Sequence, residues 1–182
     1  VTPISIPFDA CNMEEFIVEV DFHDTVISIV PRSELKRRVF PIRASLVIPQ
    51  TPENKFILAR RAKHKFPYPD VWVAGIGGLV SAGESYEDAA RREMLEEGGI
   101  MEEVKLVAKS IHDEELEKKV FHIFTTTKPV SMNDLHADPE EVQYFQAFSL
   151  EEVERMITEH PEEFASTFIT AFRAFAKEWE KR

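Results

Sequence analysis

The chain contains little glycine and almost no cysteine. Among its 182 residues there are six glycines and a single cysteine, Cys11. One cysteine cannot form a disulfide within the chain and excludes a cysteine-rich metal site, which fits a reducing compartment. No apolar run approaches the roughly 20 residues that a membrane helix needs, so we expect no membrane-spanning segment. The acidic residues near the start do not resemble a signal peptide, and the expected location is the cytoplasm.

Basic residues are also scarce relative to acidic ones. The chain has 22 Lys and Arg against 33 Asp and Glu, which gives a formal net charge of −11. This balance argues against a broad nucleic-acid-binding surface, although it leaves room for a local basic pocket. Hydrophobic residues make up 43% of the chain and charged residues 30%, which is typical of a globular protein. The length predicts one domain with at most a small appendage.

The order of apolar runs and turn residues predicts a mixed α/β fold. Runs rich in β-branched and aromatic residues predict strands at residues 16–20, 25–30, 43–48, 55–61, 104–110, 120–127 and 142–148, and residues 71–76 form a further short apolar run. Capping residues and prolines predict helices at residues 33–38, 85–98 and 149–159 and from Pro161 to the end. We expect residues 1–40 to form an N-terminal extension with a β-hairpin and a short helix, with Ser33 as its cap. Residues 41–182 would form the main domain, a sheet covered on both faces, with a C-terminal helix.

Glycine is concentrated in one short segment. Four of the six glycines lie within nine positions: Gly75, Gly77, Gly78 and Gly83. We expect a loop here whose backbone can approach a ligand closely. A helix follows, because Ser85 with Asp88 three residues later resembles a capping box. Gly98 and Gly99 are suited to the left-handed position that ends a helix.

Three glutamates of this helix share one face. Glu93, Glu96 and Glu97 stand at i, i+3 and i+4. At about 100° per residue they fall on the same arc as Tyr86 and two alanines, so they should lean toward the domain body. Carboxylates buried at close quarters must be protonated, paired or metal-bound, and hard oxygen ligands suit Mg²⁺ or Mn²⁺. A solvated acidic face is the alternative interpretation.

The spacing of these residues resembles a known motif. Gly78 is followed after five residues by Glu84 and, after seven more, by the segment REMLEEGGI that ends at Ile100. Residues 78–100 thus resemble the complete Nudix box, and the chain is identified as similar to the Nudix hydrolases. The resemblance implies an α/β fold, the Nudix α/β/α sandwich with a mixed sheet, in which the box forms a loop–helix–loop. It also implies hydrolysis of a nucleoside diphosphate linked to another moiety.

The same resemblance implies a role for each matching residue. Glu93, Glu96 and Glu97 would hold Mg²⁺ or Mn²⁺, together with the carbonyl of Gly78 or its neighbour. The catalytic set would be Glu93 and Glu97, with Glu93 as a base that activates water, and Arg92, which would orient Glu93 through a bidentate pair. Glu84 would make structural contacts near the metal.

The surrounding chain resembles isopentenyl-diphosphate isomerase and its near relatives. The isomerase carries a catalytic cysteine and a metal-binding histidine where this chain has Gly77-Gly78-Leu79-Val80, and a further histidine where it has Ile42. We therefore expect an isomerase-like scaffold that carries a hydrolase site. Isomerisation of isopentenyl diphosphate and a non-catalytic nucleotide-binding module are the alternatives to a metal-dependent hydrolase of small-molecule diphosphates.

Further residues are candidates for substrate contacts. The basic ones are Arg43, Arg60, Arg61 and Lys65, which could grip a diphosphate or simply be solvated. The resemblance to Nudix enzymes implies that an acidic residue outside the box, here Glu141, supplies a further metal ligand or the base, and a surface acid is the alternative. Three aromatic residues could stack on a base or pack in a loop: Phe66, Tyr68 and Trp72. The histidines His112, His122 and His136 lack the spacing of zinc ligands.

The C-terminal helix carries an aromatic stripe. Its members recur every three or four residues: Phe164, Phe168, Phe172, Phe175 and Trp179. Such a stripe predicts packing against the domain, and the alternative is a homodimer contact.

Overall fold

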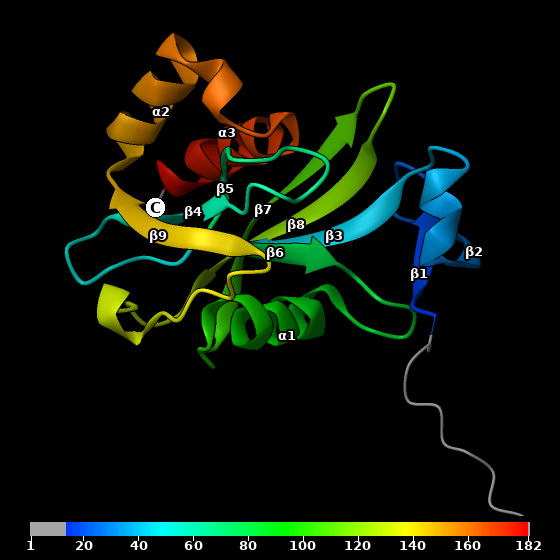
Figure 1. The fold of residues 1–182 in the computed structure, drawn as a ribbon, viewed down its shortest axis with the longest axis horizontal. Helices are drawn as coiled ribbons and strands as arrows, with labels where there is room; N and C mark the ends of the chain where they lie inside the picture. Colours follow the sequence, from blue (N-terminus) through cyan, green and yellow to red (C-terminus); the bar gives the residue numbers. More distant parts are fainter. Residues whose placement is uncertain (1–13, 182) are drawn as a thin grey trace, which may run out of the picture.

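A computed structural model describes residues 14–181, so Cys11 lies outside the described residues (Figure 1). The strands are β1 (Phe16–Val20), β2 (Val26–Pro31), β3 (Ile42–Val47), β4 (Phe56–Arg61), β5 (Trp72–Ala74), β6 (Ile76–Leu79), β7 (Val104–Asp113), β8 (Lys118–Thr126) and β9 (Val142–Phe148). The α-helices are α1 (Tyr86–Gly98), α2 (Leu150–Glu159) and α3 (Ser166–Trp179). Short 3₁₀ turns are η1 (Arg32–Lys36), η2 (Met132–Asp134) and η3 (Pro161–Glu163).

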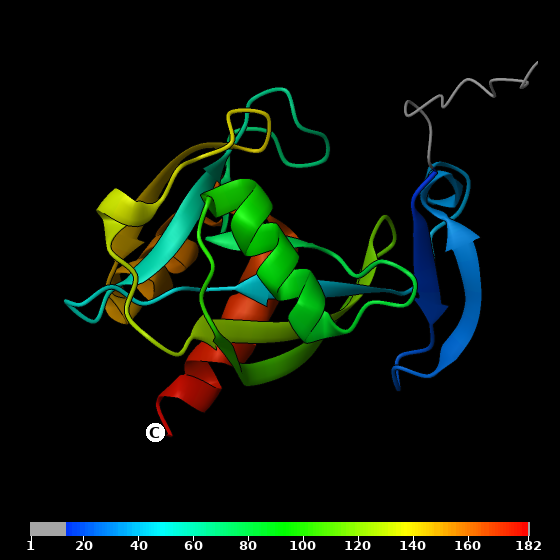
Figure 2. The same ribbon diagram turned by 90° about the horizontal axis from the view of Figure 1, so that it is seen from below.

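The strands form two sheets between helical layers. The larger sheet has the order β2-β1-β3-β8-β7, with β6 also paired to β3, and the smaller sheet has the order β5-β4-β9. The pairing of β3 with β8 is parallel, while β1, β6 and β7 pair antiparallel with their neighbours. Helix α1 covers one side of this arrangement, and α2 and α3 lie on the other (Figures 1 and 2). The expected α/β/α layering with a mixed sheet is confirmed.

The apolar run over residues 71–76 is divided between two strands, because the chain changes sheets at Gly75. Strand β5 joins β4 in the smaller sheet, and β6 joins β3 in the larger one. At Gly75 the backbones come so close that an added Cβ would lie 2.6 Å from the carbonyl oxygen of Ile57. The expected glycine loop is likewise a strand at Gly77 and Gly78, which pair with β3. The box therefore begins inside a sheet.

Two helix starts also differ from the expectation. Turn η1 begins after Pro31 without a side-chain cap, and the hydroxyl of Ser33 instead donates to Glu14 Oε1 at 2.5 Å. Pro161 opens the 3₁₀ turn η3, after which Phe164 is extended and bridges to Trp72. Helix α3 therefore starts only at Ser166. In residues 14–181 no helix is long and apolar enough to span a membrane.

The aromatic stripe of the C-terminal segment packs into the main core. Phe164, Phe168, Phe172 and Phe175 are each no more than 4% exposed. The ring of Phe175 packs edge-on against Phe56 of β4, with the centroids 5.3 Å apart. The packing prediction is confirmed for these four phenylalanines, while Trp179 at the end of the stripe is partly buried against the same core.

The N-terminal hairpin is tied to the beginning of α1. Asp24, in the hairpin turn, accepts hydrogen bonds from Arg43 Nε at 2.7 Å and from the hydroxyl of Tyr86 at 3.0 Å. The Tyr86 ring stacks on the His122 ring of β8, with the centroids 3.6 Å apart. This cluster therefore joins the hairpin, the larger sheet and the first turn of α1. The division of the chain at residue 40 stays a prediction.

Burial lowers the pKa of His122 to about 4, with the positive charge of Lys109 contributing. As the pH falls, this histidine is therefore protonated in the unfolded chain near its ordinary pKa of about 6.5, before it is protonated in the folded chain. The stability that the neutral ring contributes is present above pH 6.5 and is lost as the pH falls toward 4. We expect His122→Phe to reduce the loss of unfolding free energy between pH 7 and 4.5 by about 1 kcal/mol. Urea denaturation at both pH values measures it, and equal losses in variant and parent would contradict it.

Candidate metal and catalytic site

Helix α1 is positioned by its two ends and by its buried face. The Ser85 side chain accepts a hydrogen bond from the Asp88 backbone at 3.1 Å, and Gly99 ends the helix with a φ of 66°. Ser85 as the N-cap and Gly99 as the end of the helix are confirmed, but the capping box is not complete, because the Asp88 carboxylate accepts from the Ser85 hydroxyl at 2.6 Å. Ala89, Ala90 and Met94 are at most 1% exposed and pack in a core cluster with β3 and β6. One edge of that buried face carries the acidic side chains.

Glu97 is a buried carboxyl on α1. It is 8% exposed, and its Oε2 accepts a hydrogen bond from the backbone N–H of Gly77 in β6 at 2.9 Å. Burial raises the pKa of Glu97 to about 8, and the negative charges of Glu93 and Glu141 add to the rise. The protein thus holds an acidic group where its charged form is disfavoured unless a cation accompanies it.

Glu93 lies directly against the backbone of β6. A Cβ placed on Gly78 would come within 2.0 Å of Glu93 Oε1, so this position has no room for a side chain. Burial raises the pKa of Glu93, while its contact with Arg92 works in the opposite direction. Gly78 of the box therefore serves close packing of the backbone against a carboxyl rather than loop flexibility.

Arg92 joins the acidic residues of the box. Its Nε and Nη2 donate to the two oxygens of Glu84 at 2.9 and 3.0 Å, and its Nη1 donates to Glu93 Oε1 at 2.6 Å. Nη2 also reaches the carbonyl of Leu79 at 3.0 Å. The bidentate partner is therefore Glu84, and the expected bidentate pair with Glu93 is wrong. Glu93 is the next residue on the helix and diverges by about 100°, whereas Glu84 meets the guanidinium from the turn before α1.

Glu96 does not share the burial of its neighbours. Its side chain is 56% exposed and contacts Arg92 Nη1 at 3.2 Å. The expectation that all three glutamates lean inward holds for Glu93 and Glu97 and is wrong for Glu96, because Glu96 and Glu97 are 100° apart on the helix. Within residues 14–181, no three acidic, histidine or cysteine side chains already converge as a metal cage.

A second loop brings further charges to the carboxylates. The backbone N–H of Asp138 donates to the carbonyl of Glu97 at 3.2 Å, which ties the loop before β9 to the end of α1. Glu141 of this loop accepts from Lys65 Nζ at 2.5 Å. The charge of Glu141 raises the pKa of both Glu93 and Glu97, whereas that of Arg61 lowers the pKa of Glu97. The structure thus gathers Arg61, Lys65 and Glu141 around the two buried glutamates.

Arg43 and Arg60 have partners elsewhere. Arg43 binds Asp24 at the hairpin, as described above. Arg60 Nε binds Asp70 Oδ1 at 2.9 Å, and its guanidinium lies over the ring of Trp72. After an irregularity in the register of β4, Arg61 donates from Nε to the carbonyl of Pro67 at 3.1 Å. The structure does not bring Arg43 or Arg60 to the glutamates.

Most of the aromatic candidates and histidines are buried or hydrogen-bonded within the fold. Trp72 is 5% exposed, and the hydroxyl of Tyr68 hydrogen-bonds with Ser166 at 2.8 Å. Phe66, beside Lys65, is 92% exposed. The Nδ1 of His112 bonds to Thr170, and that of His136 to the carbonyl of Asp134.

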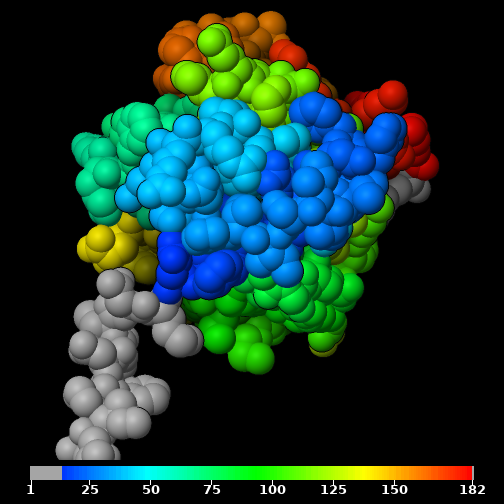
Figure 3. Space-filling model, turned by 90° about the vertical axis from the view of Figure 1, so that its right-hand side faces the viewer, coloured from blue at the N-terminus to red at the C-terminus, as the bar shows by residue number. Residues whose placement is uncertain are grey.

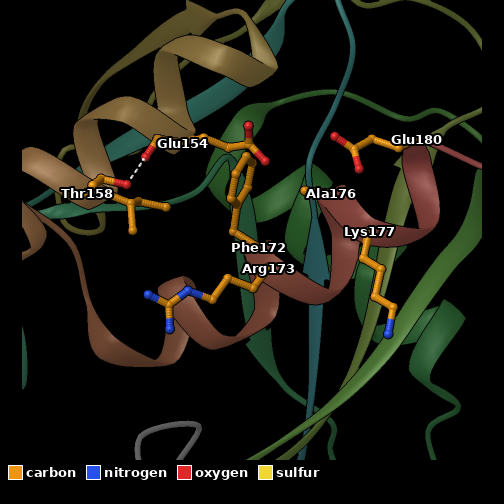
Figure 4. A pocket seen from close by; sticks show the side chains of 8 residues that line it. Glu154, Thr158, Phe172, Arg173, Ala176, Lys177 and Glu180 are labelled. Carbon is orange, nitrogen blue, oxygen red and sulfur yellow. Dashed lines mark hydrogen bonds between the residues drawn. The ribbon is translucent and has the colours of Figure 1, made fainter.

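A hollow of about 430 Å³ lies between α2 and α3 (Figure 4) and includes none of the glutamates of α1 in its lining. Its lining includes Glu154 and Thr158 of α2 and Phe172, Arg173 and Lys177 of α3. These residues belong to none of the contacts of the box, so the hollow is separate from the candidate site.

The donor set fits a divalent cation. Oxygen ligands are what Mg²⁺ and Mn²⁺ prefer. In this partly buried place the charges of Glu93 and Glu141 add to the burial that raises the pKa of Glu97. A cation would relieve this repulsion. Glu96 can join the set if its side chain leaves Arg92. The sequence pattern missed the N–H of Gly77 and the Lys65–Glu141 pair, because a backbone donor and a contact between distant loops leave no local signal.

Comparison with known proteins places the chain in a family. The NUDIX domain family model matches residues 40–168, so the chain belongs to this family. Members of the family generally use divalent metal ions. The chain is 36% identical over 95 residues to an uncharacterized Nudix hydrolase of Pseudomonas aeruginosa, covering 52% of this chain and 56% of that protein. It is 40% identical over 84 residues to a prenyl-diphosphate phosphatase of Methanosarcina mazei, covering 46% and 49%. The chain thus spans about half the length of these curated relatives.

Solved structures support the same fold. A protein from Deinococcus radiodurans superposes with a TM-score of 0.68 at 18% identity, covering 88% of this chain and 99% of that one. A MutT protein from Methanosarcina mazei gives a TM-score of 0.65 at 20% identity, covering 78% and 96%. At these identities the likeness concerns the fold alone.

Arg92 should contribute more to stability than its neighbour Arg91. Its removal leaves the largely buried Glu84 and Glu93 without their cation, and we expect Arg92→Ala to lower the free energy of unfolding by about 2–4 kcal/mol. Arg91 pairs with Glu87 and Glu103 on the exposed side of α1, so Arg91→Ala is the matched control and should cost much less. Urea denaturation at pH 7 measures both. Equal losses would contradict the role given to Arg92.

Proposed function

We propose that this chain is a metal-dependent hydrolase that cleaves the P–O–P bond of an organic diphosphate, such as a nucleoside diphosphate derivative. The observation that carries the proposal is the pair Glu93 and Glu97, held out of water against the glycines of β6 with Glu141 close by. Keeping carboxylates this close together is costly unless cations bind there. Diphosphates are substrates that such cations hold well.

The residues of the chain have separate tasks in this proposal. Arg92 fixes Glu93 and Glu84, and the Gly77 N–H fixes Glu97, so the two buried carboxyls are oriented before substrate arrives. Mg²⁺ or Mn²⁺, when bound, neutralises phosphate oxygens and lowers the pKa of a bound water. Glu93 or Glu97 accepts the proton of the attacking water. Arg61 and Lys65 place positive charge beside this position, where they can hold phosphate oxygens.

The residues fit the isomerase alternative poorly. Strand β6 carries Gly77 and Gly78, and β3 begins with Ile42, which is 4% exposed in the core. These positions offer neither a thiol acid nor imidazole ligands. The isomerase-like origin of the scaffold stays a prediction. A module that binds nucleotides without cleaving them does not require the buried carboxyls. The next experiment also tests this non-catalytic alternative.

Removing either buried charge should abolish most activity. We expect Glu93→Gln and Glu97→Gln each to lower the turnover of a cleaved diphosphate by at least about a hundredfold, because the amide neither accepts the proton nor binds a cation tightly. Glu87→Gln, on the exposed side of α1, is the matched control and should keep full turnover. Chromatographic quantification of the cleavage products with Mg²⁺ or Mn²⁺ measures it, and circular dichroism checks folding. Undiminished turnover in both folded variants would refute the site assignment.

A prenyl diphosphate is a second candidate substrate class. The relative from Methanosarcina mazei is named a prenyl-diphosphate phosphatase, and Phe66 supports an apolar tail here. This ring is 92% exposed beside Lys65, which pairs with Glu141 at the glutamates. Lys65 would hold the diphosphate while Phe66 contacts the tail.

A substrate panel separates the two classes. If the substrate has an isoprenoid tail, Phe66→Ser should raise KM for dimethylallyl diphosphate several-fold and leave KM for inorganic pyrophosphate unchanged. The panel contains ADP-ribose, nucleoside triphosphates, isopentenyl diphosphate, dimethylallyl diphosphate and inorganic pyrophosphate, each with Mg²⁺ and Mn²⁺. Cleavage of nucleotides alone would exclude the prenyl class. Interconversion of the two five-carbon diphosphates would instead support isomerase activity.

A further inference from the structure

Two loops meet beside the buried glutamates. Residues 62–70, between β4 and β5, contact residues 138–141, before β9, and Figure 3 shows the two segments, teal and yellow, at the same edge of the molecule. The backbone N–H of Ala62 donates to the carbonyl of Glu141 at 2.9 Å. Lys65 Nζ contacts Glu141 Oε1 at 2.5 Å, and these two side chains are 28% and 31% exposed. The Lys65–Glu141 ion pair thus joins the two loops at the candidate metal site.

The backbone that carries Lys65 is fixed at its base. Gln143 of β9 donates from Nε2 to the carbonyl of Arg61 at 2.7 Å and to Asp70 Oδ1 at 2.8 Å. One amide therefore holds the beginning and the end of the loop 62–70 together. The side chain of lysine is a flexible four-carbon stem with three rotatable donors. The ammonium of Lys65 can therefore change partners while its backbone stays in place.

Glu141 interacts with charges of both signs. Its carboxylate binds Lys65, and its negative charge acts on the box glutamates, since it helps to raise the pKa of both Glu93 and Glu97. The backbone of Glu141 is fixed as well, because its N–H donates to the carbonyl of Asp138 at 2.9 Å. The carboxylate is therefore the part of Glu141 that can turn from Lys65 to a cation bound by the box.

We propose, on the basis of the metal-dependent function proposed above, that a divalent cation displaces Lys65 from Glu141 and that the released ammonium then holds an oxygen of the diphosphate. A doubly charged cation attracts a carboxylate more strongly than one ammonium does. It also relieves the repulsion between Glu141 and the glutamates of α1. The order of events follows from this exchange, because Lys65 becomes available to the substrate only after the cation has bound.

Lys65 thus has two opposite effects on binding. In the absence of substrate it competes with the cation for Glu141 and weakens cation binding. Once the cation is bound, it contributes a charge-assisted contact to the phosphate and strengthens substrate binding. A lysine that only contacted substrate would show the second effect without an effect through Glu141, so the two can be measured separately.

The first test measures the binding of Mn²⁺ alone to the full chain, by calorimetry at pH 7. We expect Lys65→Met to lower the Kd for Mn²⁺ about fivefold, because the competitor of the cation is removed, and this change lies within the couplings found between contacting charges. Lys63→Met is the matched control, since Lys63 is exposed in the same loop, and it should change the Kd by less than about twofold.

A double-mutant cycle separates exchange from a general effect of charge. In the Glu141→Gln background the carboxylate that Lys65 binds is already lost. There, adding Lys65→Met should change the Kd for Mn²⁺ by less than about twofold. Equal tightening with and without Glu141 would mean that Lys65 acts on the cation only through its charge, which contradicts the exchange.

The second test follows the ion pair itself. A carbodiimide couples a lysine amine to a carboxylate in contact with it, and mass spectrometry quantifies the Lys65–Glu141 product. Mn²⁺ should suppress most of this product. Lys55 Nζ and Glu152 Oε2 lie 3.9 Å apart, between the turn before β4 and helix α2, and form the control pair. Their coupling should be the same with and without Mn²⁺.

The third test probes the released ammonium with imidodiphosphate, a diphosphate analogue that resists hydrolysis. With excess Mn²⁺, we expect Lys65→Met to raise the Kd of imidodiphosphate about tenfold, because one charge-assisted contact is lost. Lys63→Met should leave this Kd unchanged.

The outcomes distinguish this inference from the proposed function. A chain that binds no Mn²⁺ overturns both. A chain that binds Mn²⁺ with the same Kd after Lys65→Met, or whose Lys65–Glu141 coupling is insensitive to Mn²⁺, overturns the exchange and leaves the proposed function standing. Imidodiphosphate binding that Lys65→Met does not weaken overturns the phosphate contact. Tighter Mn²⁺ binding, suppressed coupling and weaker imidodiphosphate binding together support the inference.

Discussion

Two carboxyls are kept out of water against a strand that has no side chains at the point of contact. Glu93 touches the position where Gly78 would carry a Cβ, and Glu97 takes the N–H of Gly77. The rest of the site follows from this constraint. Arg92 balances the charge of Glu93, Glu84 fixes Arg92, and the buried alanines of α1 let the helix approach the sheet. The unbalanced part of the charge makes the place suitable for cations.

Local chemistry made much of the fold predictable. Ser85 and Gly99 bound α1 as their capping preferences indicate, and the aromatic spacing of α3 indicated its buried face. The errors fall where a distant segment decides. Gly75 divides one apolar run between two sheets because β4 lies against its backbone, and Phe164 leaves the helical path to bridge with Trp72. Strand β4 is distant in sequence from Gly75, and Trp72 from Phe164, so no local sequence pattern predicts these two departures.

The same division applies to the candidate site. Helical spacing and the motif together indicated Glu93 and Glu97, since both depend on one continuous segment. The wrong assignments concern side-chain direction. Glu96 points outward because it lies about 100° around the helix from Glu97. Arg92 makes its bidentate pair with Glu84. Basic residues were the least predictable, because the register of β4 is irregular between Arg60 and Arg61 and both side chains bind residues of the following loop, Asp70 and Pro67.

The parallel pairing of β3 with β8 has a consequence for how the chain reaches this state. Ile42 pairs with Lys119, so the central strand β3 pairs with a strand that comes much later in the chain. Forming such distant contacts first requires closing a large loop, which costs chain entropy and slows folding. On a ribosome, β3 leaves the exit tunnel well before β8 is made. In that interval the apolar hairpin ahead of it is exposed, which makes chaperone binding to the nascent chain advantageous.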